Sequence, residues 1–405
     1  MLCFTAPARA ERPNKVGKEV VLSCSWVHLV QGPKTLNQEY SQKEVKMKKI
    51  KLGLVLGLAV VLAWAFALPG PAAARKKMLR WGTANPMSYY YKASALLADF
   101  LRRGMPDYDL TIYPYVSTTA NIKSFLVGDL EAVYMAEPGF GKLYAFKKPF
   151  KGFEPNVKKM PAQGIWLYTM ETHILTIPKW KDKYRSWQDL DGKKIFMTKA
   201  GYMNHINIFR AMRDICGLDI THVEVDMGKV AEALRAGTID ATAVYTTATV
   251  SLASWIKVLE MATPLHGVNP TPAQIKKLTA AGFAPVKINI KKAYTRDLGV
   301  DELYGVPFYF GQHFGLDFPE EGVYKILKVL EKASGDLAKI EAGFGPLAKD
   351  FAGFQVLGIK SIPQVPVHPG LARYLKEKGL WDPAWKVATD RTIKAAVEAM
   401  KAKAH

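Results

Sequence analysis

The stretch Leu79–Leu101, LRWGTANPMSYYYKASALLADFL, decides the fold. It begins with a short apolar run, is interrupted at Gly82–Pro86, and continues from about Ser88 as an amphipathic helix with apolar residues at helical spacing. The start of a helix offers unpaired N–H groups and a favourable dipole, which suit an anion or a polar ligand group. The alternative is a plain strand–helix turn whose tyrosines pack in a core: Tyr89, Tyr90 and Tyr91.

The segment 47–74 has the layout of a secretory signal peptide. Met47–Lys51 is basic, Leu52–Leu68 is apolar, and the small residues that end at Ala74 form a cleavage site. An uncleaved transmembrane anchor is the alternative, because the apolar run is about as long as the shortest spanning helices. No cysteine stands directly after the run, so we expect no lipid anchor. Residues 1–46 are expected to be an extension from a mis-called start codon.

The chain is basic, with a formal net charge of +20. Its lysines are scattered, no block of five or more occurs, and export would separate the protein from nucleic acid. We therefore expect no nucleic-acid partner, and we interpret the charge as a solvated surface that can steer anions. Cys216 is the only cysteine after the leader and lies in an apolar helical pattern, which predicts a buried thiol.

Further strand–loop–helix units follow the opening one. Leu110–Val116 is predicted to be a strand that leads through Ser117–Asn121 into a helix ending at Gly128, and Ala132–Met135 is a third strand. Polar loops at the carboxyl ends of such strands predict an open α/β sheet with a ligand at that edge. A second series follows a polar segment; its predicted elements are Lys194–Thr198, Ile206–Ile215, Val223–Val225, Val230–Arg235 and Ile239–Tyr245.

This repetition predicts two α/β lobes. Gly164–Tyr168 and His173–Ile177 are predicted as two strands between the series, with a break near Glu171–Pro178. We assign 75–173 to the first part of lobe 1, 178–264 to lobe 2, and 265–400 to a crossover, a return to lobe 1 and the C-terminal helices. The short segments that cross between the lobes would act as a hinge.

No catalytic motif stands out. The chain lacks a zinc-protease motif, a paired C-x-x-C, a nucleophile elbow and a phosphate-binding loop. Histidines after the leader stand alone, and His368, before Pro-Gly, is expected to cap a helix. We therefore predict no enzyme activity, no cofactor and no metal.

Five short motifs resemble the TAXI-type solute-binding proteins of tripartite ATP-independent periplasmic (TRAP) transporters. They cover about residues 78–382 in the order of that family: Gly82–Lys92, Ser117–Asn121 with Gly128, Gly192–Ile195 followed by Ala200–Asn204, Leu234–Ala241, and Pro366–Gly370. Larger residues replace several of the family's glycines, for example at Ala84, Met87 and Tyr202. Because a glycine loop lets the backbone approach a ligand closely, we expect a narrower pocket in a divergent branch.

The resemblance implies a two-lobed periplasmic-binding-protein fold of type II, an α/β fold in which each lobe is a mixed sheet flanked by helices. It implies a periplasmic protein that captures a small, carboxylate-bearing or amino-acid-like ligand between its lobes and delivers it to TRAP membrane subunits. The alternatives are an ABC-type substrate-binding protein, or a sensor or enzyme on the same fold.

The family motifs place the ligand-binding residues on both sides of one cleft. These are Thr83, Asn85, Ser88, Tyr89, Tyr90, Thr118, Thr119, Asn121, Thr198, Tyr202, Asn204, Tyr245 and Thr246. Glu137 is added because it lies one residue beyond the family's usual glutamine and could accept from an amino group. Its alternative role is that of an acid at a helix start beside Pro138. No arginine lies in these loops, so helix N-termini are expected to neutralise a ligand carboxylate.

Overall fold

The computed structural model describes Met47 and Lys76–Lys403. Except for Met47, the predicted extension and signal peptide lie outside the described residues. The residues Lys76–Lys403 belong to one compact unit. No helix within this part of the chain combines the length and the apolar content that crossing a bilayer requires.

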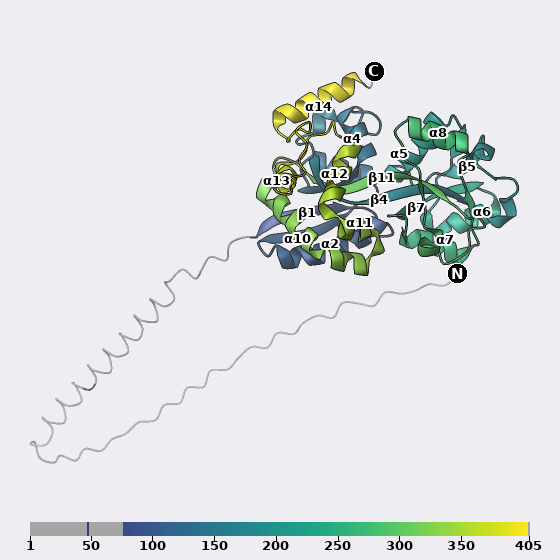
Figure 1. The fold of residues 1–405 in the computed structure, drawn as a ribbon, viewed down its shortest axis with the longest axis horizontal. Coiled ribbons are helices and arrows are strands. Elements are labelled where there is room, and N and C mark those ends of the chain that lie inside the picture. The colour runs from purple at the N-terminus through teal and green to yellow at the C-terminus, as the bar shows by residue number, and fades with distance from the viewer. Residues whose placement is uncertain (1–46, 48–75, 404–405) are drawn as a thin grey trace, which may run out of the picture. The chain divides into compact units, whose positions relative to one another are not determined.

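The first lobe is built from the predicted strand–loop–helix units (Figure 1). Its three parallel strands are β1 (Lys77–Thr83), β2 (Tyr108–Pro114) and β3 (Ala132–Ala136), with β1 in the centre. Its first three helices are α2 (Tyr89–Gly104), α3 (Thr118–Leu126) and α4 (Glu137–Tyr144). The side chain of Ser88 caps α2 by accepting from the Tyr91 N–H, as expected for a serine before a helix.

The second lobe repeats this plan. Its parallel strands are β5 (Lys193–Phe196), β6 (Ile220–His222) and β7 (Ala241–Thr247), and its helices include α5 (Met203–Phe209), which continues as the π-helical turn η4 (Arg210–Ile215), and α6 (Val230–Ala236). The prediction of a strand at Val223–Val225 is wrong, because the strand ends at His222. Gly237 ends α6 with a φ of 72°, a conformation that glycine adopts without strain.

Two long antiparallel strands join the lobes: β4 (Ala162–Thr176) and β11 (Tyr304–Phe314). The expectation of two short strands with a break near Glu171 is wrong, because β4 is one strand of 15 residues. Its first half pairs with β11, and its second half also pairs with β7 of the second lobe. All the strand groups therefore lie on one hydrogen-bonded path, in the order β2-β1-β3-β11-β4-β7-β5-β6.

The remaining elements complete both lobes. They are η1 (Glu154–Asn156), η2 (Pro178–Trp180), η3 (Trp187–Leu190), η5 (Met227–Lys229), β8 (Ser251–Leu252), α7 (Ser254–Ala262), β9 (His266–Val268), α8 (Pro272–Ala280), β10 (Val286–Lys287), α9 (Ile290–Ala293), α10 (Glu320–Ile340), η6 (Ala342–Phe344), α11 (Gly345–Lys349), α12 (Phe351–Ser361), α13 (Pro369–Glu377) and α14 (Asp390–Ala402). His368 caps α13 by accepting from the Gly370 N–H, which confirms the predicted cap.

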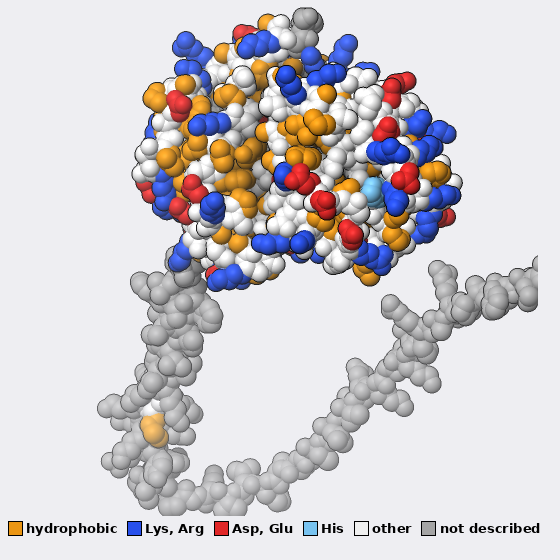
Figure 2. All heavy atoms as spheres, turned by 45° about the vertical axis from the view of Figure 1, so that its right-hand side comes forward, with side chains coloured by type: hydrophobic (Ala, Val, Ile, Leu, Met, Phe, Trp, Pro, Cys, Tyr) orange, Lys and Arg blue, Asp and Glu red, His pale blue; other side chains and the backbone are white. Residues whose placement is uncertain are grey.

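The larger hydrophobic core runs from the first lobe into the second through Phe196, Tyr245 and Trp255. A smaller core fills the second lobe and includes Trp187 and Cys216, whose thiol is buried as predicted. Lys and Arg side chains are spread over the face shown in Figure 2, with acidic groups among them.

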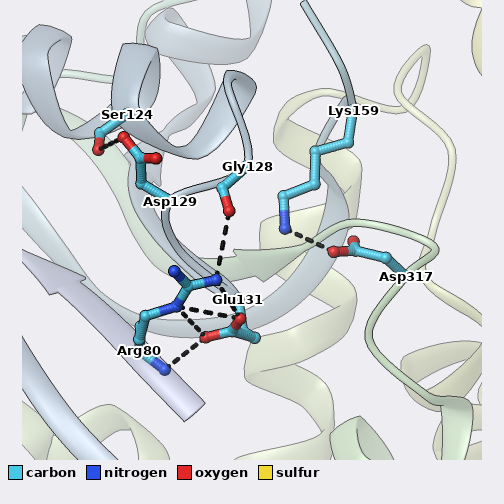
Figure 3. Close-up of polar contacts among 7 residues, drawn as sticks. All are labelled: Arg80, Ser124, Gly128, Asp129, Glu131, Lys159 and Asp317. Carbon is cyan, nitrogen blue, oxygen red and sulfur yellow. Dashed lines mark hydrogen bonds and ion pairs between the residues drawn. The ribbon is translucent and has the colours of Figure 1, made fainter. Parts of the chain in front are cut away.

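Ionic contacts hold the segment that precedes β3 in place (Figure 3). The Arg80 guanidinium on β1 donates to both carboxylate oxygens of Glu131, at 2.6 and 3.0 Å, and to the Gly128 carbonyl oxygen at 3.2 Å. Lys159 pairs with Asp317 at 2.6 Å nearby. The forked geometry of Arg80 thereby holds the segment before β3 beside β1.

Burial holds three histidines neutral, and each has a backbone group at a ring nitrogen. His313 on β11 accepts from the Gly164 N–H at Nδ1 (3.0 Å), and its Nε2 lies 3.2 Å from the Met135 carbonyl oxygen. Burial lowers the pKa of His313 to about 3, and the pKa values of His173 and His368 to about 4. A second proton on His313 would remove the acceptor that Gly164 needs.

We predict that stability falls as the pH drops from 7 to 5. The three histidines take up protons only on unfolding, so their contribution is complete above their ordinary pKa of about 6.5 and is lost toward 4. The slope is about 1.4 kcal/mol per pH unit for each histidine. Urea unfolding of the parent and of His313→Gln at both pH values tests this. If the free energy of unfolding falls equally in both proteins between pH 7 and pH 5, His313 does not contribute to the pH dependence.

A second prediction concerns Gly358, where α12 packs on β4. A Cβ at this position would overlap the indole ring of the fully buried Trp166. We expect Gly358→Ala to lower the free energy of unfolding by about 1–3 kcal/mol. The matched control is Gly335→Ala in α10, where a Cβ meets no atom within 4 Å. It should be neutral or stabilising by up to about 1 kcal/mol. Similar effects of the two substitutions would contradict this packing.

Candidate functional site

The carboxyl ends of the parallel strands of both lobes point toward the middle of β4 and β11. Six buried tyrosines gather there, which we call the tyrosine cluster: Tyr89, Tyr90, Tyr134, Tyr168, Tyr202 and Tyr245. Tyr90 stacks on Tyr134 with ring centroids 3.7 Å apart, and Tyr89 meets Tyr168 edge to face at 5.1 Å. These four belong to the first lobe, and the last two come from the second.

Burial keeps the hydroxyl groups of this cluster protonated. It raises the pKa of Tyr245 to about 12, against the opposing influence of the Trp255 indole and the Tyr89 backbone N–H. Burial is also the main cause that raises the pKa of Tyr134, with added contributions from Tyr245, Tyr90 and Tyr202. The cluster therefore presents neutral O–H groups, which donate hydrogen bonds.

The two lobes touch directly at the start of α3. The backbone N–H and the hydroxyl of Thr119 both donate to the Gly201 carbonyl oxygen, at 3.2 and 3.0 Å. Gly201 has a φ of +87°, and a Cβ there would lie 3.2 Å from Ser117. Glycine thus permits both the backbone conformation and the close approach.

Five buried polar atoms on the predicted site residues and on β7 have no hydrogen-bond partner among the described residues: the Tyr89 hydroxyl, Nδ2 of Asn121, Oγ1 of Thr198, the Tyr202 hydroxyl and Oγ1 of Thr247. The Asn121 amide lies inside the first lobe, where its Oδ1 accepts from the Tyr134 N–H at 2.9 Å and its Nδ2 packs against Gly82. Both lobes contribute. A buried polar group without a partner costs about 1–3 kcal/mol. Groups of this kind at one place are ready to donate to an incoming molecule.

Several predicted site residues bond within their own lobe. The Thr83 hydroxyl accepts from Ser94 at 3.0 Å, the Asn85 side chain accepts from the Met87 N–H at 2.9 Å, and Asn204 lies 3.5 Å from the Thr172 hydroxyl. Thr118, predicted with them, is buried at the start of α3.

Tyr90 occupies the core, as the alternative for the three tyrosines supposed. Its hydroxyl donates to Gln312 and accepts from the Trp81 indole N–H at 3.1 Å. Both of its hydrogen-bonding roles are therefore used inside the first lobe. Tyr89 differs, because its hydroxyl faces the region of Glu341 and Thr247.

Two predicted residues take part in hydrogen bonds of carboxyl groups, those of the buried Glu171 and of the partly exposed Glu137. The Thr246 hydroxyl donates to Glu171 on β4 at 2.8 Å, and the Thr249 N–H donates to the same oxygen at 2.8 Å. Glu137 begins α4 and accepts from the Tyr309 N–H at 2.6 Å. Burial raises the pKa of Glu137 to about 8. Its position at the helix start agrees with the alternative role considered for it.

Sequence reasoning missed five residues of this region: Tyr134, Tyr168, Glu171, Thr247 and Glu341. Glu341 follows α10 and bridges the lobes, since it accepts from Lys92 and from Ser251, both at 2.5 Å. Tyr134 was detectable as the polar-tipped residue of a short apolar strand. Glu341 carried no signal, because its partners are distant in the sequence.

The sequence profile of the NMT1-like family matches residues 83–379. The chain belongs to the NMT1-like family. This span includes every strand end named above. The narrower resemblance to TAXI-type proteins remains a prediction for this NMT1-like chain. Comparison with curated proteins gives no significant match.

Solved structures resemble this NMT1-like chain at low identity. The alkanesulfonate-binding protein SsuA from Xanthomonas axonopodis pv. citri is 16% identical, with a TM-score of 0.41 and coverage of 78% of this chain and 98% of that one. MatC from Rhodopseudomonas palustris, with bound malate, is 11% identical, with a TM-score of 0.45 and coverage of 72% and 97%. A putative L-cystine ABC transporter protein from Listeria monocytogenes is 14% identical, with a TM-score of 0.39 and coverage of 66% and 96%.

We predict that Thr119→Val increases the fraction of molecules in which the lobes are open. The substitution keeps the N–H bond to Gly201 and removes the hydroxyl bond, which contributes about 1 kcal/mol, or roughly fivefold in the balance between open and closed forms. Small-angle scattering should give a larger radius of gyration than for the parent. Thr111→Val, the same chemical change on β2, is the control. An unchanged radius in Thr119→Val would show that this contact does not hold the lobes together.

Proposed function

We propose that this protein is the exported solute-binding subunit of a secondary, ion-gradient-driven TRAP transporter. It captures a small organic acid or an amino-acid-like ligand when its lobes close. The observation that carries the proposal is the junction of strand ends from both lobes, where Tyr89 of the first lobe and Thr198, Tyr202 and Thr247 of the second hold buried groups that have no hydrogen-bond partner among the described residues. A carboxylate accepts from such donors, and the N-termini of α3 and α5 lie at the same junction.

Binding, rather than catalysis, is the function that these groups suit. Burial raises the pKa values of Tyr202 and Tyr245, so their hydroxyls donate hydrogen bonds and are poor nucleophiles. The direct contact between Thr119 and Gly201 must break before a ligand can enter. Capture would then proceed by opening and reclosing of the two lobes about β4 and β11.

The remaining parts of the proposal rest on the sequence. Cleavage after Ala74 would release the mature chain into the periplasm, and an N-terminal sequence beginning at Arg75 would support it. The lobe limits near residues 173, 178 and 264 are part of the same proposal. The TAXI resemblance favours a TRAP membrane partner over an ABC transporter, and the neighbouring gene decides between them: a large multi-span protein for TRAP, an ATPase for ABC.

We predict that Tyr202→Phe weakens ligand binding without lowering stability. Its hydroxyl has no partner among the described residues, so removing it costs the ligand-free protein nothing. A ligand that accepts from this hydroxyl would lose about 1–1.5 kcal/mol, or roughly tenfold in affinity. Thermal shifts with a panel of small carboxylic and amino acids, joined by native mass spectrometry of the purified protein, identify the ligand, and calorimetry gives its affinity.

Tyr144→Phe is the matched control, because the Tyr144 hydroxyl donates to the Pro161 carbonyl oxygen at 2.9 Å away from the junction. It should lower stability by about 1 kcal/mol and leave affinity unchanged. If Tyr202→Phe binds the ligand as tightly as the parent, the hydroxyl does not contact it and the proposed site is wrong.

A further inference from the structure

A hollow lies between the lobes on the side of α4 and α5, and no residue of the tyrosine cluster lines it. We call it the α4–α5 groove, and its volume is about 730 Å³. Its walls are α4 with the ends of α12 and α14 from the first lobe, and α5 with residues 282–284 from the second. Pro307–Tyr309 of β11 form part of its lining. Figure 1 shows α4, α12 and α14 on one side and α5 on the other.

Basic side chains from both lobes line the groove, with Lys403 after α14 among them. Four lie in or next to α4, α5 and α12: Lys142, Lys147 and Lys360 from the first lobe, and Arg210 from the second. Among Lys76–Lys403, acidic groups pair with many other cations, but none lies within 4.0 Å of these four. Positive charge from both lobes is therefore gathered here, with no carboxylate at ion-pairing distance from these four side chains among Lys76–Lys403.

Two of these cations are held in place. The Arg210 guanidinium stacks on the Phe283 ring, 4.8 Å from its centroid, and both residues line the groove. Lys142 is half-buried, and its pKa is lowered by burial first and then by Lys147, with Asp214 opposing the shift and Arg210 and Arg213 adding to it. An anion that binds between neighbouring cations offsets the repulsion between their charges.

The acid of the groove does not cancel this charge at neutral pH. Glu137 is the carboxyl group that lines it, and burial raises its pKa to about 8. At pH 7 this carboxyl is mostly protonated, and a protonated carboxyl can donate a hydrogen bond to an anionic oxygen.

We propose that the α4–α5 groove binds a small polyvalent anion with two or more carboxylate or phosphate groups. Lys142 and Lys360 hold it from the first lobe and Arg210 from the second. Because the anion touches both lobes, it favours the arrangement in which α4 and α5 are packed together. This site does not depend on the ligand proposed for the tyrosine cluster.

Calorimetry on the mature chain at pH 7 tests the proposal with citrate and with inorganic pyrophosphate, and acetate at equal ionic strength serves as the monovalent reference. We expect one or both polyvalent anions to bind, and Lys142→Ala/Arg210→Ala to weaken binding at least tenfold. The control is Lys257→Ala/Lys276→Ala, which removes the same charge from α7 and α8 and should bind within twofold of the parent. Binding of one probe alone identifies the group that the groove prefers.

Lys147→Ala/Lys360→Ala changes two exposed residues and gives a second variant if the first one fails to fold. Tyr202→Phe should bind citrate and pyrophosphate as tightly as the parent, because Tyr202 does not line the groove. The proposal for the groove can therefore fail without the proposal for the solute site failing, and the reverse. The proposal is overturned if neither probe binds, or if the groove variants and the control bind equally. Binding of a hexaglutamate peptide without either small anion would also overturn it, in favour of an acidic protein partner.

Discussion

Hydrogen bonds between β4 and β11 hold the two lobes in one sheet. β3 of the first lobe pairs with β11, and β7 of the second lobe pairs with β4, so each lobe is attached to this central pair. The register places Phe310 opposite both Ala136 and Tyr168, and Met170 opposite Thr247. The ends of β3 and β7 thereby lie close to the same few residues of β4. This strand pairing alone brings together the polar loops that follow β3 and β7.

Polar groups buried along this pair follow two patterns. Some have all their partners within a lobe, as His313 has in Gly164 and Met135, and Glu171 in Thr246 and Thr249. Such groups add specificity to the packing, because each partner fits only one register. Where the lobes meet, Thr198 and Tyr202 lack partners among the described residues. The difference separates the part of the interior that serves the fold from the part that can exchange bonds with a solute.

The local units could be predicted from the sequence because their signals are local. Apolar spacing and a capping serine define the helix after Ser88, and a glycine ends the helix at Gly237. β4 could not be predicted as one strand, because Glu171 and His173 interrupt its apolar run. They are buried through partners that are distant in the sequence, Thr246 and Tyr294. The local motifs predicted which loops meet at the junction. They could not predict that the Tyr90 hydroxyl is hydrogen-bonded in the core while the Tyr202 hydroxyl is not, because this depends on partners distant in the sequence.

The shared strands also limit how this architecture can be divided. A fragment that ended at the lobe boundary would separate β4 from a strand with which it pairs, and it would expose unpaired backbone N–H and C=O groups along that edge. The larger core, which passes through Phe196 and Trp255, would be cut as well. The lobes are therefore not modules that recombination can exchange one at a time. Diversification of such a chain is confined to the loops at the strand ends and to the helices on its outer faces, while the central pair must be inherited whole.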